Sequence, residues 1–282
     1  MTLVRTESLV RAAVERSSAV AAFNVITMEH AEAIVAGAEA AGCGVILQIS
    51  QNAVRFHGAQ LRPIAAAALA LAELSNVEVA LHLDHVTDIE LLRQAADAGF
   101  SSIMFDAGDL SYQANVAATR AAAQEGHSAG LWVEAELGYV GGKAGAPAGA
   151  HVAGVRTDPV EAGDYVIACG VDALAVAVGS SHAMTTRSAQ LDHDLIRLIA
   201  AKVALPLVLH GSSGVPDTEL RAATSAGMRK INIGTALNIA FTDAVREHLA
   251  SDDQVTDPRT YLGGARKAMS DIVTTLIQAI TA

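Results

Sequence analysis

The sequence predicts a single-domain α/β protein in which eight parallel strands, each followed by a helix, close into a (β/α)8 or TIM barrel. Three observations support this fold class. The chain has 282 residues, of which 51% are hydrophobic and 17% charged, so it can bury one large core. Only 4% are aromatic, which indicates the aliphatic core of a parallel sheet wrapped in helices. Short apolar runs also alternate with longer stretches of helical periodicity. We therefore expect residues 1–282 to form one barrel domain.

The eight expected strands are short apolar runs bounded by turn residues. They lie at residues 19–26, 45–50, 79–85, 102–107, 131–138, 173–179, 206–211 and 230–235. Ala- and Leu-rich segments lie between them, and several end in glycine as helices often do. An amphipathic N-terminal helix precedes the barrel and a helical extension follows it. A doubly wound open sheet would show the same alternation and is the alternative.

Net charge, apolar stretches and cysteine content indicate which binding partners and which cellular location to expect. The formal net charge of −11 argues against a general affinity for nucleic acid or anionic lipid, which bind basic surfaces, while a small anionic substrate stays possible. No apolar stretch approaches the ~20 residues that span a bilayer. The two cysteines, Cys43 and Cys169, form neither a C-x-x-C motif nor a disulfide framework. We expect a cytoplasmic protein that binds neither nucleic acid nor membrane.

Three histidines stand at or just after the ends of separate expected strands. His85 ends the third strand, His182 follows the sixth, and His210 ends the seventh. In this fold the catalytic groups come from the C-terminal ends of the strands, so the three imidazoles should meet at one rim. One such histidine alone could be structural, but three imidazoles with an open coordination position form a catalytic zinc arrangement. Asp84 directly precedes His85 at the end of the same strand.

Two glutamates lie on one face of the fifth strand, because Glu134 and Glu136 are two residues apart. An inward carboxylate is costly unless it is paired or hydrogen-bonded. Glu136 is nearer the C-terminal end and is the candidate for a mechanistic role, whereas Glu134 could simply be paired inside the barrel.

The segments after strands seven and eight are typical of a phosphate site. TIM barrels commonly bind phosphate there with backbone N–H groups and a helix N-terminus. Gly211 and Gly214 allow close backbone approach, and Ser213 and Thr235 supply hydroxyl groups.

The motifs at these positions resemble a known family. AFNV, LHLDH, VEAELG, TDP, GVDALAVAVGSSH, LPLVLHGSSGVP, KINIGT and DPRTYLGGARKAM occur in this order across almost the whole chain. Together they resemble the class II fructose-bisphosphate and tagatose-bisphosphate aldolases. The resemblance implies a lyase of carbohydrate metabolism that splits a ketose bisphosphate into dihydroxyacetone phosphate and an aldehyde.

The resemblance also implies roles for the strand-end residues. His85, His182 and His210 would hold Zn²⁺, with a monovalent cation as a possible second ion, and Asp84 would work on the C4 oxygen. Zinc would stabilise the negative charge of the enediolate as a Lewis acid. A Schiff-base mechanism would instead need a lysine at the rim. Lys230, the lysine of the KINIGT strand, lies at the wrong, N-terminal end.

The same resemblance implies a substrate-binding set. The residues expected at the dihydroxyacetone phosphate end are Gly211, Ser213, Asn232 and Thr235. Ser50 and Asp106, after the second and fourth strands, would line the same mouth. Arg266 resembles the arginine that reaches the distal phosphate, in some members from a neighbouring subunit.

Two segments depart from the family pattern. The family has an acidic residue in a mobile loop after ELG, whereas residues 139–156 contain glycines and no acid. We expect a mobile lid there, with the missing proton transfer assigned to Glu136. The family also reads HG-x-Y-K where this chain has His182 and then Ala183; Arg187 would replace the phosphate-binding lysine.

Other functions stay open at this stage. A barrel without the loop acid could bind metal and phosphate without catalysis, and a metal-dependent hydrolase is a further alternative. The sequence does not distinguish fructose from tagatose bisphosphate, zinc from cobalt or manganese, or a homodimer from a homotetramer.

Overall fold

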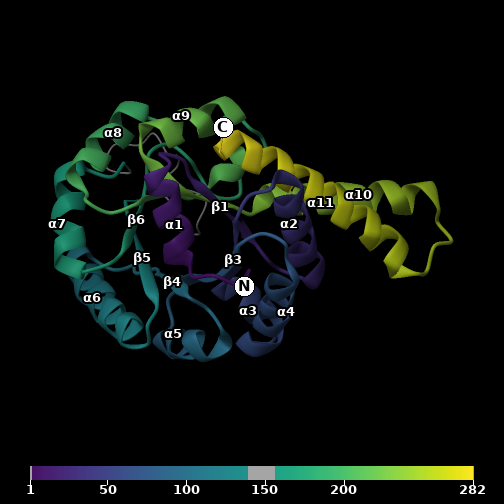
Figure 1. The fold of residues 1–282 in the computed structure, drawn as a ribbon, viewed down its shortest axis with the longest axis horizontal. Helices are drawn as coiled ribbons and strands as arrows, with labels where there is room; N and C mark the ends of the chain where they lie inside the picture. Colours follow the sequence, from purple (N-terminus) through teal and green to yellow (C-terminus); the bar gives the residue numbers. More distant parts are fainter. Residues whose placement is uncertain (1, 139–155, 282) are drawn as a thin grey trace.

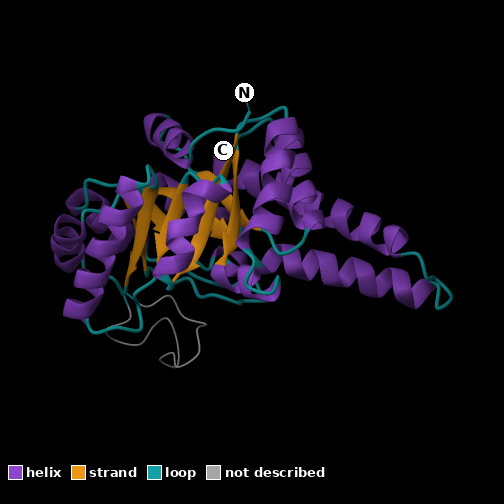
Figure 2. Cartoon of the chain, turned by 90° about the horizontal axis from the view of Figure 1, so that it is seen from below, coloured by secondary structure: helices purple, strands orange, loops and turns teal. Residues whose placement is uncertain are grey.

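The computed structural model describes residues 2–138 and 156–281, and it contains a closed barrel of eight parallel strands in chain order (Figures 1 and 2). The strands are β1 (Val20–Asn24), β2 (Val45–Ser50), β3 (Val79–Val86), β4 (Ser102–Phe105), β5 (Trp132–Leu137), β6 (Ala173–Val176), β7 (Leu207–Leu209) and β8 (Met228–Ile233). Pairing of β8 with β1 closes the sheet. The TIM-barrel prediction is confirmed and an open sheet is excluded.

Helices surround this barrel. They are α1 (Thr6–Glu15), α2 (Met28–Ala41), α3 (Gln51–Phe56), α4 (Leu61–Leu74), α5 (Ile89–Ala95), α6 (Tyr112–Ser128), α7 (Pro159–Cys169), α8 (His193–Lys202), α9 (Asp217–Ala226), α10 (Thr235–Ser251) and α11 (Pro258–Thr281), with 3-10 turns η1 (Ala96–Ala98) and η2 (Ser212–Gly214). Apolar side chains on the outer faces of the strands form the main core with these helices. Within the described ranges, no helix is long and apolar enough to cross a membrane.

Helix α1 closes the N-terminal end of the barrel, where Figure 1 shows it lying across the strands. Its buried side chains Leu9, Val10 and Ala13 form a second apolar cluster with inward-facing residues such as Ile46 and Val208. Apolar side chains therefore fill much of this end of the barrel, with a few hydrogen-bonded polar residues such as Thr6 and Ser102 among them.

The expected C-terminal extension is a pair of helices. α10 and α11 run beside each other and project from the barrel (Figure 1). The second half of α11 packs back against α2 through buried residues that include Val273 and Ile277.

Candidate active site

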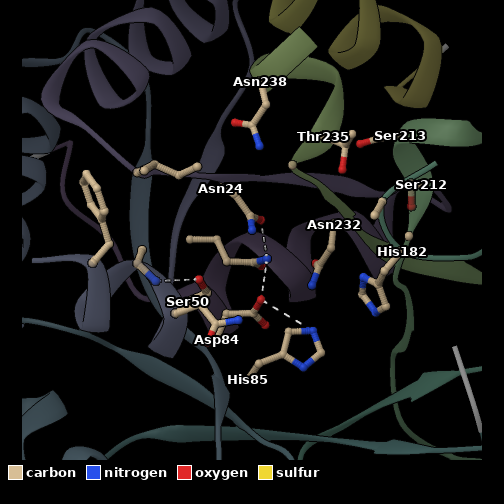
Figure 3. A pocket seen from close by; sticks show the side chains of 18 residues that line it. Asn24, Ser50, Asp84, His85, His182, Ser212, Ser213, Asn232, Thr235 and Asn238 are labelled. Carbon is tan, nitrogen blue, oxygen red and sulfur yellow. Dashed lines mark hydrogen bonds and ion pairs between the residues drawn. The ribbon is translucent and has the colours of Figure 1, made fainter. Parts of the chain in front are cut away.

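A cavity of about 340 Å³ opens at the C-terminal ends of the strands (Figure 3). It is lined by Asn24, Ile26, Gln48, Ser50, Asn52, Ala53, Phe56, Asp84, His85, His182, Ala183, Gly211, Ser212, Ser213, Asn232, Gly234, Thr235 and Asn238. Ser50 and most of the site residues expected from the sequence line this cavity.

A β-bulge at the end of β3 directs two neighbouring side chains into this cavity. Strict alternation along a strand would point Asp84 and His85 to opposite faces. The register with β4 shifts between Leu83 and Val86, and His85 takes a left-handed conformation with φ 48°. A bulge of this kind re-aims a side chain, and a non-glycine residue with positive φ is strained. The local backbone therefore allows both residues to line the cavity.

The three strand-end histidines form one cluster. Ring nitrogens of His85, His182 and His210 lie within 4.8 Å of one another. Their ring centroids are 5.1 to 5.8 Å apart, and the rings meet edge to face. The histidines come from different parts of the chain, after β6 and at the ends of β3 and β7, so the closed barrel is what assembles them.

The surroundings of two of these rings fit a metal site. His85 Nδ1 lies 2.8 Å from Asp106 Oδ2, and His210 Nε2 lies 2.9 Å from Glu134 Oε1. A carboxylate that holds one ring nitrogen leaves the other nitrogen for a metal and fixes the orientation of the ring. Asp106 thus lies behind His85 instead of lining the mouth as expected. Three imidazoles of this kind suit zinc and several related divalent ions.

Asp84 is a buried carboxylate with an unused acceptor. Its Oδ2 accepts a hydrogen bond from Gln48 Nε2 at 3.0 Å, and its Oδ1 has no hydrogen-bond partner among the described residues. Burial alone would raise the pKa of Asp84, but the neighbouring imidazoles, His85 above all, hold it well below its ordinary value. The carboxylate is therefore ionised and can accept a proton from a bound ligand.

Below the histidines, the barrel interior contains a buried ionic network. Glu134 Oε2 lies 2.8 Å from Lys230 Nζ, and both side chains are fully buried. Burial would raise the pKa of Glu134, but Lys230 and His210 outweigh burial and lower it to about 2. Burial likewise opposes protonation of His210, whereas its contacts with Glu134 and Glu136 raise its pKa to about 9. The pairing expected of Glu134 is therefore present.

The loop after β7 passes very close to the segment that carries His182. Gly211 has φ 67°, and a Cβ placed there would lie 2.6 Å from the carbonyl carbon of Ser181 and 3.0 Å from the backbone nitrogen of His182. Only glycine combines this conformation with this approach. Gly211 therefore allows the β6 and β7 loops to meet at the cavity.

The opposite wall has the features of a phosphate site. Ser213 lies in η2, and its Oγ accepts a hydrogen bond from the backbone N–H of Ala236 in the first turn of α10. Thr235 is the first residue of α10, and Asn238 follows one turn later. A helix N-terminus with nearby hydroxyl groups is favourable for an anion. Figure 3 shows these side chains on the side of the cavity away from Asp84.

Two arginines expected at phosphates lie elsewhere. Arg187 donates to the carbonyl oxygen of Val215 and pairs with Asp217, and Arg266 pairs with Glu32. Neither arginine is among the described residues that line the cavity. In this arrangement acidic partners hold both guanidinium groups away from the site, and their contacts with phosphate stay predictions.

Glu136 lies on the barrel interior but is not among the described cavity-lining residues. Its Oε2 is 2.9 Å from His210 Nδ1, so it contacts the histidine cluster on the side of His210 opposite to Glu134. The expected lid at residues 139–156 lies, except for Arg156, outside the described residues.

Several polar residues in or beneath the site are not among those expected there from the sequence. Gln48, Asn24 and Asn238 line the cavity, and Lys230 lies beneath it. Gln48 could have been found, because it is two residues before Ser50 on the same strand and therefore faces the same way. Asn24 is the last residue of β1, a position that the same strand-end argument covers.

Comparison with known proteins agrees with this geometry. The family model described as "Fructose-bisphosphate aldolase class-II" matches residues 4–282. Fructose-bisphosphate aldolase of Geobacillus stearothermophilus is 38% identical over 275 residues, 97% of this chain and 95% of that protein. The enzyme of the same name from Staphylococcus aureus (strain Mu50) is 35% identical over 274 residues, with 97% and 95% of the two chains covered.

Solved structures give the same result. The crystal structure of the YdjI aldolase from Escherichia coli K12 superposes with a TM-score of 0.85 at 30% sequence identity, covering 99% of this chain and 97% of that one. The chain therefore belongs to the class II fructose-bisphosphate aldolase family.

Proposed function

We propose that this enzyme is a metal-dependent aldolase that reversibly cleaves fructose or tagatose 1,6-bisphosphate into dihydroxyacetone phosphate and glyceraldehyde 3-phosphate. Family membership supplies the reaction class. One observation supports the specific reaction: three clustered imidazoles, two of which line the cavity, lie beside Asp84 Oδ1 and Asn232 Nδ2, polar atoms without a hydrogen-bond partner among the described residues.

The histidines would hold the metal. Bound by His85, His182 and His210, zinc would supply Lewis-acid stabilisation of the negative charge that develops on the ketose oxygens. The proposed ion is zinc because its usual catalytic sites have three protein ligands and one open position.

Asp84 would carry the acid-base step. In the cleavage direction a base must take the proton of the C4 hydroxyl as the C3–C4 bond breaks. Asp84 is ionised, and its Oδ1, which has no hydrogen-bond partner among the described residues, can accept that proton; in condensation it would return the proton. Glu136 is proposed to move the proton at the enediolate carbon.

The remaining cavity residues would bind and orient the dihydroxyacetone phosphate half. Asn232 Nδ2 has no hydrogen-bond partner among the described residues, so it can donate to an oxygen that gains negative charge. Gly211, Ser213, Thr235 and the N-terminus of α10 would hold the phosphate.

Cleavage of the two bisphosphates by zinc-loaded protein tests this function. Dihydroxyacetone phosphate should form from at least one of them, and Asp84→Asn should lower kcat by roughly 10²- to 10⁴-fold, the range for a lost acid-base group. Asp97→Asn, which changes an exposed carboxylate on η1, should leave kcat unchanged. Formation of no product from either sugar would overturn the proposal, as would full activity in Asp84→Asn.

A further inference from the structure

Lys230 is a fully buried ammonium group that the proposed reaction does not use. Its Nζ lies 2.8 Å from Glu134 Oε2, 2.8 Å from Asn232 Oδ1 and 3.4 Å from Gln48 Oε1. An ammonium group has three donors and no acceptor. These three contacts therefore match its whole hydrogen-bonding capacity.

The three partners come from three strands that the sequence separates widely. Gln48 is on β2, Glu134 on β5, and Asn232 on β8 with Lys230 itself. Each of these side chains faces the barrel interior, and each is buried. Lys230 thus links strands on different sides of the barrel directly beneath the cavity.

Lys230 determines which way two side-chain amides face. Because an ammonium group can only donate, Asn232 and Gln48 must both turn their amide oxygens toward it. The Gln48 nitrogen is then free to donate to Asp84 Oδ2 at 3.0 Å and to Asn24 Oδ1 at 2.9 Å. The Asn232 nitrogen is left without a partner in the described structure, at the wall of the cavity.

Lys230 also acts on the histidine cluster through Glu134. One oxygen of Glu134 accepts from Lys230 and the other contacts His210 Nε2 at 2.9 Å. A neutral imidazole that donates from Nε2 presents its Nδ1 as a lone pair. With Nε2 held by the Glu134–Lys230 pair, Nδ1 is the ring nitrogen of His210 left for a metal, on the side where Glu136 Oε2 lies 2.9 Å away.

From these contacts we propose that Lys230 is a positioning residue for aldol cleavage, which orients the amides of Gln48 and Asn232 and, through Glu134, the ring of His210. This inference rests on the proposed function. It assigns Lys230 no covalent role, because its donors are engaged and it is not among the described residues that line the cavity.

Lys230→Met tests the proposal, because methionine keeps an unbranched side chain and removes all three donors. We expect kcat to fall by roughly 10²-fold while KM changes less than 5-fold, since misorientation of about 1 Å can cost that much. Metal affinity, measured by competition with a chromophoric chelator, should weaken by about 10- to 100-fold, as when the carboxylate partner of a ligand is lost. Lys202→Met, an exposed lysine on α8, is the matched control and should change neither value.

Lys230→Met leaves the Glu134 carboxylate buried without its cation, so that variant could fail to fold. The double variant Lys230→Met/Glu134→Gln removes the charge and keeps an acceptor oxygen for His210. It should fold, and it should show the same loss of kcat. Wild-type kcat and metal affinity in a folded variant would overturn the proposal; so would failure of both variants to fold, which would assign Lys230 to stability. Failure of the proposed function would appear differently, as wild-type protein that cleaves neither bisphosphate.

Discussion

The close contact beneath Gly211 gives a sharp prediction for Gly211→Ala. The added Cβ would lie 2.6 Å from the carbonyl carbon of Ser181, whereas ordinary contact begins near 3.4 Å, so the backbone would have to retreat by about 0.8 Å. That backbone carries His182 as the next residue. A displacement close to 1 Å at a catalytic group can cost about 10²-fold in rate.

A second glycine, Gly42, provides a control that has the backbone strain of an alanine substitution without the close contact. Gly42 has φ 65°, nearly the φ of 67° at Gly211, but a Cβ there would have nothing within 4 Å. Each alanine in the left-handed region should cost about 1–2 kcal/mol of folding free energy. Gly42→Ala should therefore lose stability alone, while Gly211→Ala should also lose metal affinity and about 10²-fold in kcat.

The assay compares chemical unfolding, metal affinity and the rate of fructose 1,6-bisphosphate cleavage in the two variants. The prediction is wrong if both variants lose the same stability and both cleave the substrate at the wild-type rate. It would mean that the Gly211 contact does not set the position of His182.

Three further predictions follow from the buried acids and the histidine cluster. Glu136→Gln should suppress exchange of the dihydroxyacetone phosphate proton with solvent while binding stays within a few-fold; unchanged exchange, measured by NMR in deuterated water, would exclude Glu136. The pKa of His210 is raised from 6.5 to about 9, so its protonation should stabilise the metal-free protein below pH 6.5, and that stabilisation should be lost as the pH rises through 9. Equal free energies of unfolding below pH 6.5 and above pH 9 would contradict this prediction. Glu134→Leu removes the carboxylate partner of the buried Lys230 ammonium group and should lower the free energy of unfolding by about 3–5 kcal/mol. A clearly smaller loss in chemical unfolding would contradict this prediction.

Much of the fold could be predicted from the sequence because periodicity is a local property. Apolar runs marked all eight strands, although β1, β4, β6, β7 and β8 end two or three residues earlier than expected. The strand-end rule also brought His85, His182 and His210 together, since parallel strands in a closed barrel end at one rim.

Other features depend on contacts that no local pattern contains. The bulge that turns both Asp84 and His85 into the cavity breaks the period of two on which strand reasoning relies. Lys230 contacts side chains of β2 and β5 only because the barrel is closed. The position of Lys230 within its own strand indicates only that it lies far from the rim. Arg187 and Arg266 were assigned to phosphates by resemblance, and their pairing with nearby acids appears only in the folded chain.

Metal removal and reconstitution decide whether cleavage depends on an ion held by the three histidines. Protein stripped with a chelator should cleave no fructose 1,6-bisphosphate, and stoichiometric zinc should restore the rate. Substitution of His182 by alanine should prevent that recovery while the protein stays folded, because it removes one of the three clustered imidazoles. Full cleavage activity in rigorously metal-free protein would contradict the claim that His85, His182 and His210 hold a catalytic metal.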